Sequence, residues 1–226
     1  MDGANSLFER LKATSAEDWK RYTHHDFVAG IADGTLPEAA FRHYLIQDYL
    51  FLIQFARAYA LAVYKSDTLV DMRQAGAGMS AILDTEMALH VEFCRGWNLS
   101  EIEMEAAPED SACMAYTRFV LERGMSGDLL DLHIALAPCI VGYAEIGARL
   151  TSDTATLIDG NPYGSWIEMY SSEDYQAVAT DEVAFLDDLM ARRAGPGRFD
   201  SLADTFGKAT RLEVDFWQMG LNHTGD

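Results

Sequence analysis

Three residues carry groups suited to catalysis on segments that are otherwise apolar. Asp48 lies in YLIQDYLFLIQF, where the side chains three and four residues away are tyrosine, leucine and phenylalanine. Glu213 lies in RLEVDFWQMG, and Cys139 lies in LAPCIVGYAEIG. Because an unpaired charge is costly to bury, a carboxylate on such a face is either bonded to a partner or used in a reaction. A thiol and two carboxyl groups could supply a nucleophile, an acid and a group that binds a polar ligand.

Each of these residues also has a structural interpretation. A buried carboxyl group such as Asp48 or Glu213 can form an internal hydrogen bond to a tyrosine or to the backbone. Cysteine is often a small apolar filler, so Cys139 on its own does not establish catalysis. Glu86 and His90 are four residues apart, and this spacing suits either a metal site or a helical polar pair.

The elements that must position these residues are helices. Nearly every periodic segment repeats its apolar residues at a helical spacing, and no run shows the alternation of a strand. Gly, Pro and Asn separate the segments, and Pro138 removes one backbone hydrogen bond beside Cys139. The pattern predicts helices over residues 15–31, 37–65, 67–97 (loosened at Gly76 and Gly78), 100–106, 111–123, 128–150, 164–169, 173–193 and 201–221.

Length and periodicity together predict one all-α domain, a helical bundle that covers residues 1–226. We expect residues 1–14 to form an N-terminal extension and residues 222–226 a C-terminal tail. The chain has 226 residues, 49% of them hydrophobic and 23% charged, which is typical of a globular protein with a large core.

The charge balance excludes several partners. Thirty-six acidic residues against 17 basic ones give a formal net charge of −19, so nucleic acids and anionic membrane surfaces would be repelled. Three cysteines argue against a disulfide framework and favour a reducing compartment, and we expect a cytoplasmic protein. The apolar run LLDLHIALAPCIVGYAEIG contains Asp131, His133, Pro138 and Glu145, which argue against a membrane span.

Five segments, in this order and spacing, resemble the TenA (thiaminase II) family: FVAGIADGTLPEAAFRHYLIQDYLFLIQFARAYA, LDTEMALHVEF, LAPCIVGYAEIG, NPYGSWIEMY and LEVDFWQMG. The resemblance extends from about Phe27 to Gly220. The most specific feature is Pro-Cys followed by a tyrosine and a glutamate four and six residues after the cysteine. The chain is therefore identified as similar to the branch of the family that carries this cysteine.

The resemblance implies a haem-oxygenase-like helical fold, a homotetramer and a hydrolase. The implied substrate is a 4-amino-2-methylpyrimidine in thiamin salvage or degradation. Its 5-aminomethyl derivative, and in some members thiamin, would be converted to 4-amino-5-hydroxymethyl-2-methylpyrimidine. The sequence does not fix whether ammonia, a formylated amine or the thiazole of thiamin is the preferred leaving group. The implied chemistry needs no cofactor and no metal.

By the same resemblance, Cys139 corresponds to the nucleophile, Glu213 to the catalytic acid and base, and Asp48 to the carboxylate that holds the aminopyrimidine. The implied aromatic lining of the substrate site consists of Phe51, Tyr116, Tyr143 and Tyr170. Some members have tyrosine where this chain has Phe51, so one polar contact is in doubt. The chemistry is consistent with these roles, because a leaving group departs more readily once a proton and a thiolate have been added to the ring.

Two alternatives stay open on the sequence alone. One is a metal-dependent oxygenase or oxidase on the same helical fold, which would need several histidine and carboxylate ligands from different helices. Glu86, His90 and Glu145 could contribute to such a site, although residues 173–193 contain no histidine. The other is a regulatory module that binds a pyrimidine without turnover.

Overall fold

The computed structural model describes residues 6–223, and within this range every regular element is a helix. A π-helix, η2, interrupts the long helical segment between α5 and α6. The elements are α1 (Leu7–Thr14), α2 (Ala16–Thr23), α3 (Asp26–Asp33), α4 (Glu38–Lys65), α5 (Leu69–Ala81), η2 (Ile82–Glu86), α6 (Met87–Arg95), α7 (Glu101–Glu105), α8 (Ser111–Ser126), α9 (Leu129–Ser152), α10 (Gly164–Ser171), α11 (Glu173–Arg193) and α12 (Arg198–Asn222). The all-α prediction is confirmed.

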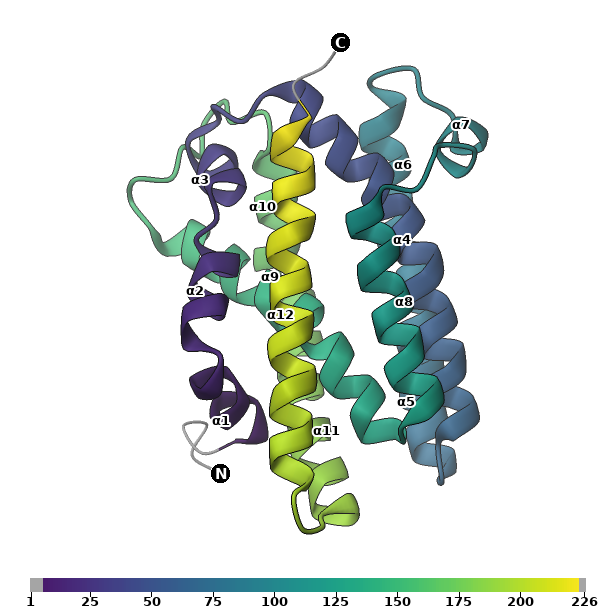
Figure 1. Ribbon diagram of the computed structural model, residues 1–226. Coiled ribbons are helices and arrows are strands. Elements are labelled where there is room, and N and C mark those ends of the chain that lie inside the picture. The colour runs from purple at the N-terminus through teal and green to yellow at the C-terminus, as the bar shows by residue number, and fades with distance from the viewer. Residues whose placement is uncertain (1–5, 224–226) are drawn as a thin grey trace.

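Helix α9 is the central element of the bundle. It packs against α8, α10, α11 and α12, while α4 packs against α5, α8 and α12 (Figure 1). Among the described residues, α9 is the one helix long and apolar enough to cross a membrane, and 78% of its most apolar window is buried inside the bundle. A core helix surrounded by other helices is expected to be apolar around most of its circumference.

Residues 7–14, within the segment expected to be an N-terminal extension, are part of the bundle. They form α1, which the Ser6 side chain caps by accepting a hydrogen bond from the Glu9 N–H. Leu7, Phe8 and Leu11 are buried, and α1 packs against α11 and α12. At the other end, α12 ends at Asn222; residues 1–5 and residues 224–226 of the expected tail lie outside the described residues.

Two predicted helices are interrupted at positions that apolar periodicity does not reveal. The segment 15–31 divides at His24 and His25, because the His25 ring accepts a hydrogen bond from the Phe27 N–H and begins α3. The segment 67–97 was expected to loosen at Gly76 and Gly78, but the irregular turn is η2. Gly78 instead makes room for the Tyr59 ring, since a Cβ at this position would lie 2.4 Å from a Tyr59 ring carbon.

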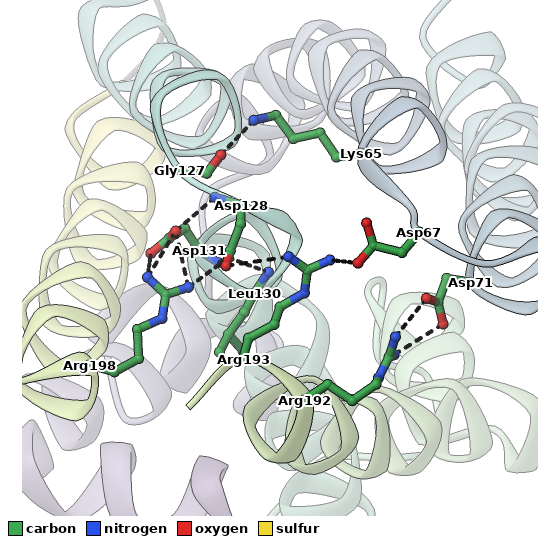
Figure 2. Close-up of polar contacts among 10 residues, drawn as sticks. All are labelled: Lys65, Asp67, Asp71, Gly127, Asp128, Leu130, Asp131, Arg192, Arg193 and Arg198. Atoms are coloured by element: carbon green, nitrogen blue, oxygen red, sulfur yellow. Dashed lines mark hydrogen bonds and ion pairs between the residues drawn. The ribbon is translucent and has the colours of Figure 1, made fainter. Parts of the chain in front are cut away.

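An ionic network ties together helix ends that are far apart in sequence (Figure 2). Arg198, at the start of α12, contacts Asp128 at 2.6 Å and Asp131 at 3.0 Å, at the start of α9. At the end of α11, Arg192 contacts Asp71 of α5 at 2.9 Å, and Arg193 pairs with Asp128 and with Asp67. Because the desolvation of such ions offsets much of their attraction, we infer that the network mainly fixes where these helices end relative to one another.

Candidate active site

Glu213 and Tyr116 form a buried hydrogen-bonded pair between α12 and α8. The Tyr116 hydroxyl donates to Glu213 Oε1 at 2.8 Å, and each of the two residues is 1% exposed. Burial, and then the charge of Asp48, raise the pKa of Glu213 to about 8, against the opposing hydrogen bonds from Tyr116 and Cys139. Glu213 therefore carries a proton at neutral pH and can act as an acid.

The Cys139 thiol lies beside the Glu213 carboxyl group and is only partly buried. Burial, followed by the negative charges of Glu213, Glu86 and Asp48, raises the pKa of the thiol well above its ordinary value. The resting cysteine is therefore protonated. It becomes a nucleophile only if a neighbouring group takes its proton, and Glu213 is the carboxyl group whose charge affects the thiol most.

The turn of α9 around Cys139 is held by a tyrosine from α2. The Tyr22 hydroxyl donates to the Pro138 carbonyl at 3.2 Å, and the Tyr22 ring lies against Gly142. A Cβ at Gly142 would lie 2.2 Å from a Tyr22 ring carbon, so only glycine permits this approach. The backbone on both sides of Cys139 is thereby fixed.

Asp48 of α4 is bonded to a residue whose role the sequence left open. Asp48 Oδ2 lies 2.6 Å from His90 Nε2, and His90 Nδ1 lies 2.9 Å from the Glu86 carbonyl. A carbonyl only accepts, so Nδ1 carries a hydrogen, and the short Nε2 contact requires a further proton between the ring and the carboxylate. Burial alone would lower the pKa of His90, but the bond to Asp48 and its charge outweigh burial, and the pKa is raised. The bond to Asp48 therefore favours the protonated form of the His90 ring.

Aromatic side chains connect Asp48 to α9 and α10. The Tyr44 hydroxyl donates to Asp48 at 3.1 Å, accepts from the Trp166 indole N–H at 3.3 Å, and lies 3.4 Å from the Tyr143 hydroxyl. The ring of Tyr143 in turn contacts that of Tyr170, with centroids 4.7 Å apart. These buried rings provide flat apolar surfaces suited to a planar heterocycle.

Phe51 lies among aromatic rings on the other side of Asp48. Its ring centroid is 5.1 Å from that of Tyr116 and 5.5 Å from that of Phe216, and Phe51 is 2% exposed. Since this residue has no hydroxyl, it can stack on a ligand but not hydrogen-bond to it.

The structure thus places the three sequence-identified residues on the buried sides of α4, α9 and α12. The charge of Glu213 raises the pKa of the Cys139 thiol, and the charge of Asp48 raises the pKa of both groups. Asp48 is 5% exposed and Glu213 1% exposed. The four predicted lining residues belong to the same buried aromatic cluster. The catalytic roles of Cys139, Glu213 and Asp48 and the binding roles of the lining residues stay predictions.

Of the two glutamates whose place the sequence left open, one belongs to this cluster. Glu86 accepts a hydrogen bond from the Tyr170 hydroxyl at 3.3 Å. Glu145 instead accepts from Lys12 at 2.6 Å and from the Trp19 indole at 3.0 Å, and it connects α9 to the N-terminal helices. Among residues 6–223, no three histidine, cysteine, aspartate or glutamate side chains converge as a metal site would require. The donor set needed for the oxygenase alternative is therefore not assembled in this part of the chain.

Comparisons with known proteins extend these observations. Residues 13–223 match the TENA/THI-4/PQQC family. An aminopyrimidine aminohydrolase of Halalkalibacterium halodurans is 34% identical, over 98% of this chain and 96% of its own. An aminopyrimidine aminohydrolase of Helicobacter pylori is 32% identical, over 89% and 92% of the two chains. The crystal structure of a TenA family transcription regulator from Silicibacter sp. TM1040 is 47% identical and superposes with a TM-score of 0.90, covering 96% of each chain.

Proposed function

Because this chain belongs to the TENA/THI-4/PQQC family, we propose that it is an aminopyrimidine aminohydrolase. It hydrolyses 4-amino-5-aminomethyl-2-methylpyrimidine to the 5-hydroxymethyl compound and ammonia, and serves thiamin salvage. The observation that carries the proposal is the buried hydrogen bond between Glu213 and Tyr116, in the core against which Cys139 also packs. A regulator without turnover would need neither an acid nor a thiol at this place.

The arrangement of groups supports a defined sequence of proton and electron movements. Asp48, which is bonded to His90, accepts hydrogen bonds from the amino-substituted edge of the pyrimidine. Glu213 donates its proton to a ring nitrogen and then takes the proton of the Cys139 thiol, whose sulfur adds to the ring. The electron-rich ring expels the amine, which keeps the electron pair of the broken carbon–nitrogen bond. Water adds to the methylene carbon and gives up one proton. The sulfur departs with the electron pair of its bond to the ring and takes up that proton, which restores the thiol. The ring nitrogen then releases its proton to the ammonia, and the neutral aromatic ring is restored.

The direct test is turnover by the purified wild-type protein. We expect the aminomethyl pyrimidine to be converted to the hydroxymethyl pyrimidine with release of one ammonia for each product molecule. Thiamin is assayed in parallel as a second substrate. Chromatography of the pyrimidines and an ammonia assay measure both products. Tight binding of the pyrimidine by calorimetry with no product would instead identify a binding module. Stoichiometric iron with oxygen uptake would identify the oxygenase.

We also propose that the chain assembles as a homotetramer through the side formed by α5 and its neighbours. Large apolar side chains are exposed there on the end of α4, on α5 and on η2: Tyr64, Leu69, Val70, Met72 and Leu83. Contiguous exposed apolar residues often mark protein interfaces. A cytoplasmic location is consistent with three free cysteines, which a reducing compartment maintains.

Charge placed on this side should dissociate the assembly. We expect the double variant Leu69→Glu, Val70→Glu to have a smaller mass in solution than the wild-type protein, because four buried carboxylates from each pair of contacting copies would repel one another. Light scattering after size-exclusion chromatography measures the mass. Ile102→Glu on α7 is the matched control, since Ile102 is 79% exposed outside this side and should leave the mass unchanged. An unchanged mass in the double variant would exclude this interface.

A further inference from the structure

Glu86 has a carboxyl group at the edge of the aromatic cluster, and the proposed reaction does not use it. It belongs to a closed ring of contacts around the aromatic cluster. The Tyr44 hydroxyl lies 3.1 Å from the Asp48 carboxyl group and 3.4 Å from the Tyr143 hydroxyl. The aromatic rings of Tyr143 and Tyr170 are in contact. From Tyr170 the ring of contacts reaches the Glu86 carboxyl group at 3.3 Å, and from the Glu86 carbonyl it returns through His90 to Asp48. Asp48 and Glu86 thus lie on one ring, separated by His90.

Glu86 lies at the junction between the π-helix η2 and α6. Glu86 is the last residue of η2, and α6 begins at Met87. The Glu86 carbonyl lies 2.9 Å from Nδ1 of the His90 ring, while the Glu86 carboxyl group accepts from Tyr170 of α10. π-Helical turns within α-helices are frequent at functional sites, because the extra residue changes the direction of the following side chains.

The contacts of Glu86 leave one of its oxygens available. Oε1 accepts the Tyr170 hydroxyl hydrogen, and within residues 6–223 Oε2 has no hydrogen-bond partner. Glu86 is partly rather than fully buried. Its charge raises the pKa of the Cys139 thiol, and the charge of Asp48 in turn raises the pKa of Glu86.

We propose that Glu86 binds the positively charged leaving amine of the substrate, and so selects substrates whose leaving group carries a cation. This inference rests on the proposed function. With the pyrimidine edge on Asp48 and the ring nitrogen on Glu213, Glu86 is the remaining acidic group near the thiol. A carboxylate oxygen accepts from a primary ammonium through a strong, charge-assisted hydrogen bond.

The reaction remains balanced with Glu86 in this role. The amine enters as –NH3+ against the Glu86 carboxylate, the carbon–nitrogen bond breaks, and its electron pair passes to nitrogen, so that neutral ammonia leaves. Burial, together with the charge of Asp48, raises the pKa of Glu86 to about 7 against the opposing effects of His90 and Tyr170. A bound cation would favour the ionised form, so substrate binding itself would ionise Glu86.

The test compares leaving groups that differ in charge. Glu86→Gln retains an oxygen that accepts from Tyr170, so the ring of contacts is preserved. We expect this variant to lower kcat/KM for the cationic aminomethyl pyrimidine at least about 10-fold more than for its neutral N-formyl derivative, as expected for loss of a charged hydrogen bond. The Kd of the hydroxymethyl product, which has no amine, should change by less than about twofold.

The outcomes separate this inference from the proposed function. Glu145→Gln is the matched control, because it removes a carboxylate from α9 outside the aromatic cluster and should change both substrates equally. If the wild-type protein hydrolyses neither compound, the proposed function is wrong. If it hydrolyses them but Glu86→Gln lowers both rates by the same factor, Glu86 is a structural partner of Tyr170 and the inference is overturned.

Discussion

Cys139→Ser is expected to lower kcat for the aminomethyl pyrimidine at least about 100-fold, while the hydroxymethyl product binds with nearly the same Kd. Serine has almost the same shape as cysteine, so the packing of α9 should persist. A hydroxyl group, however, is a far weaker nucleophile than a thiol, and it does not yield its proton to a carboxylate such as Glu213 at neutral pH. Steady-state rates and calorimetric titration with the product measure the two effects.

Cys113→Ser is the matched control for this experiment. Cys113 is buried, and its thiol donates to the Gln47 carbonyl at 3.4 Å, a bond that a serine hydroxyl can replace. Full activity in this variant would show that loss of a buried thiol does not by itself impair the enzyme. A Cys139→Ser protein with a near-wild-type rate would remove covalent catalysis from the mechanism.

The helical fold could be predicted because apolar periodicity reports which side of each helix is buried. The breaks could not, because they depend on local hydrogen bonds. His24 is the C-cap of α2, and His25 begins α3 by accepting from the Phe27 N–H. Residues 7–14 have too few apolar positions to show a helical repeat, so α1 was not predicted. Phe8 of α1 packs against the rings of Trp19 and Phe206, which belong to other helices.

The candidate site was partly predictable for the same reason. Asp48 and Glu213 stand out in sequence because their helical neighbours are apolar. The roles of His90 and Glu86 could not be derived, because a regular helical projection pairs these two side chains with each other. In the structure the His90 ring instead bonds to Asp48 on α4, and the Glu86 carboxyl group bonds to Tyr170 on α10. These partners are 42 and 84 residues away in the chain, where periodicity carries no information.

Glu213→Gln is expected to lower kcat at least about 100-fold, the lower range for loss of a positioned acid. The amide can still accept a hydrogen bond from Tyr116, so the contact between α8 and α12 should persist. In the wild-type protein the rate should fall as pH rises through about 8, where the acid loses its proton. A rate that stays constant up to pH 9 would exclude Glu213 as the acid.

The same substitution should stabilise the fold at alkaline pH. The pKa of Glu213 is about 8 in the folded protein against an ordinary value of 4.5, so between these values the folded state binds more protons than the unfolded state. The free energy of unfolding of the wild-type protein therefore falls as pH rises across this window. The Glu213→Gln variant does not show this fall, because glutamine does not titrate. Glu86, with a pKa of about 7, lowers the free energy of unfolding of both proteins by a similar amount and cancels in the comparison.

We therefore expect the Tm difference between Glu213→Gln and wild type to be at least about 3 °C larger, in favour of the variant, at pH 8.5 than at pH 5. Calorimetry at the two pH values measures this difference. A Tm difference that does not change with pH would mean that Glu213 is already ionised in the folded protein, and that it cannot donate the proton that the reaction needs.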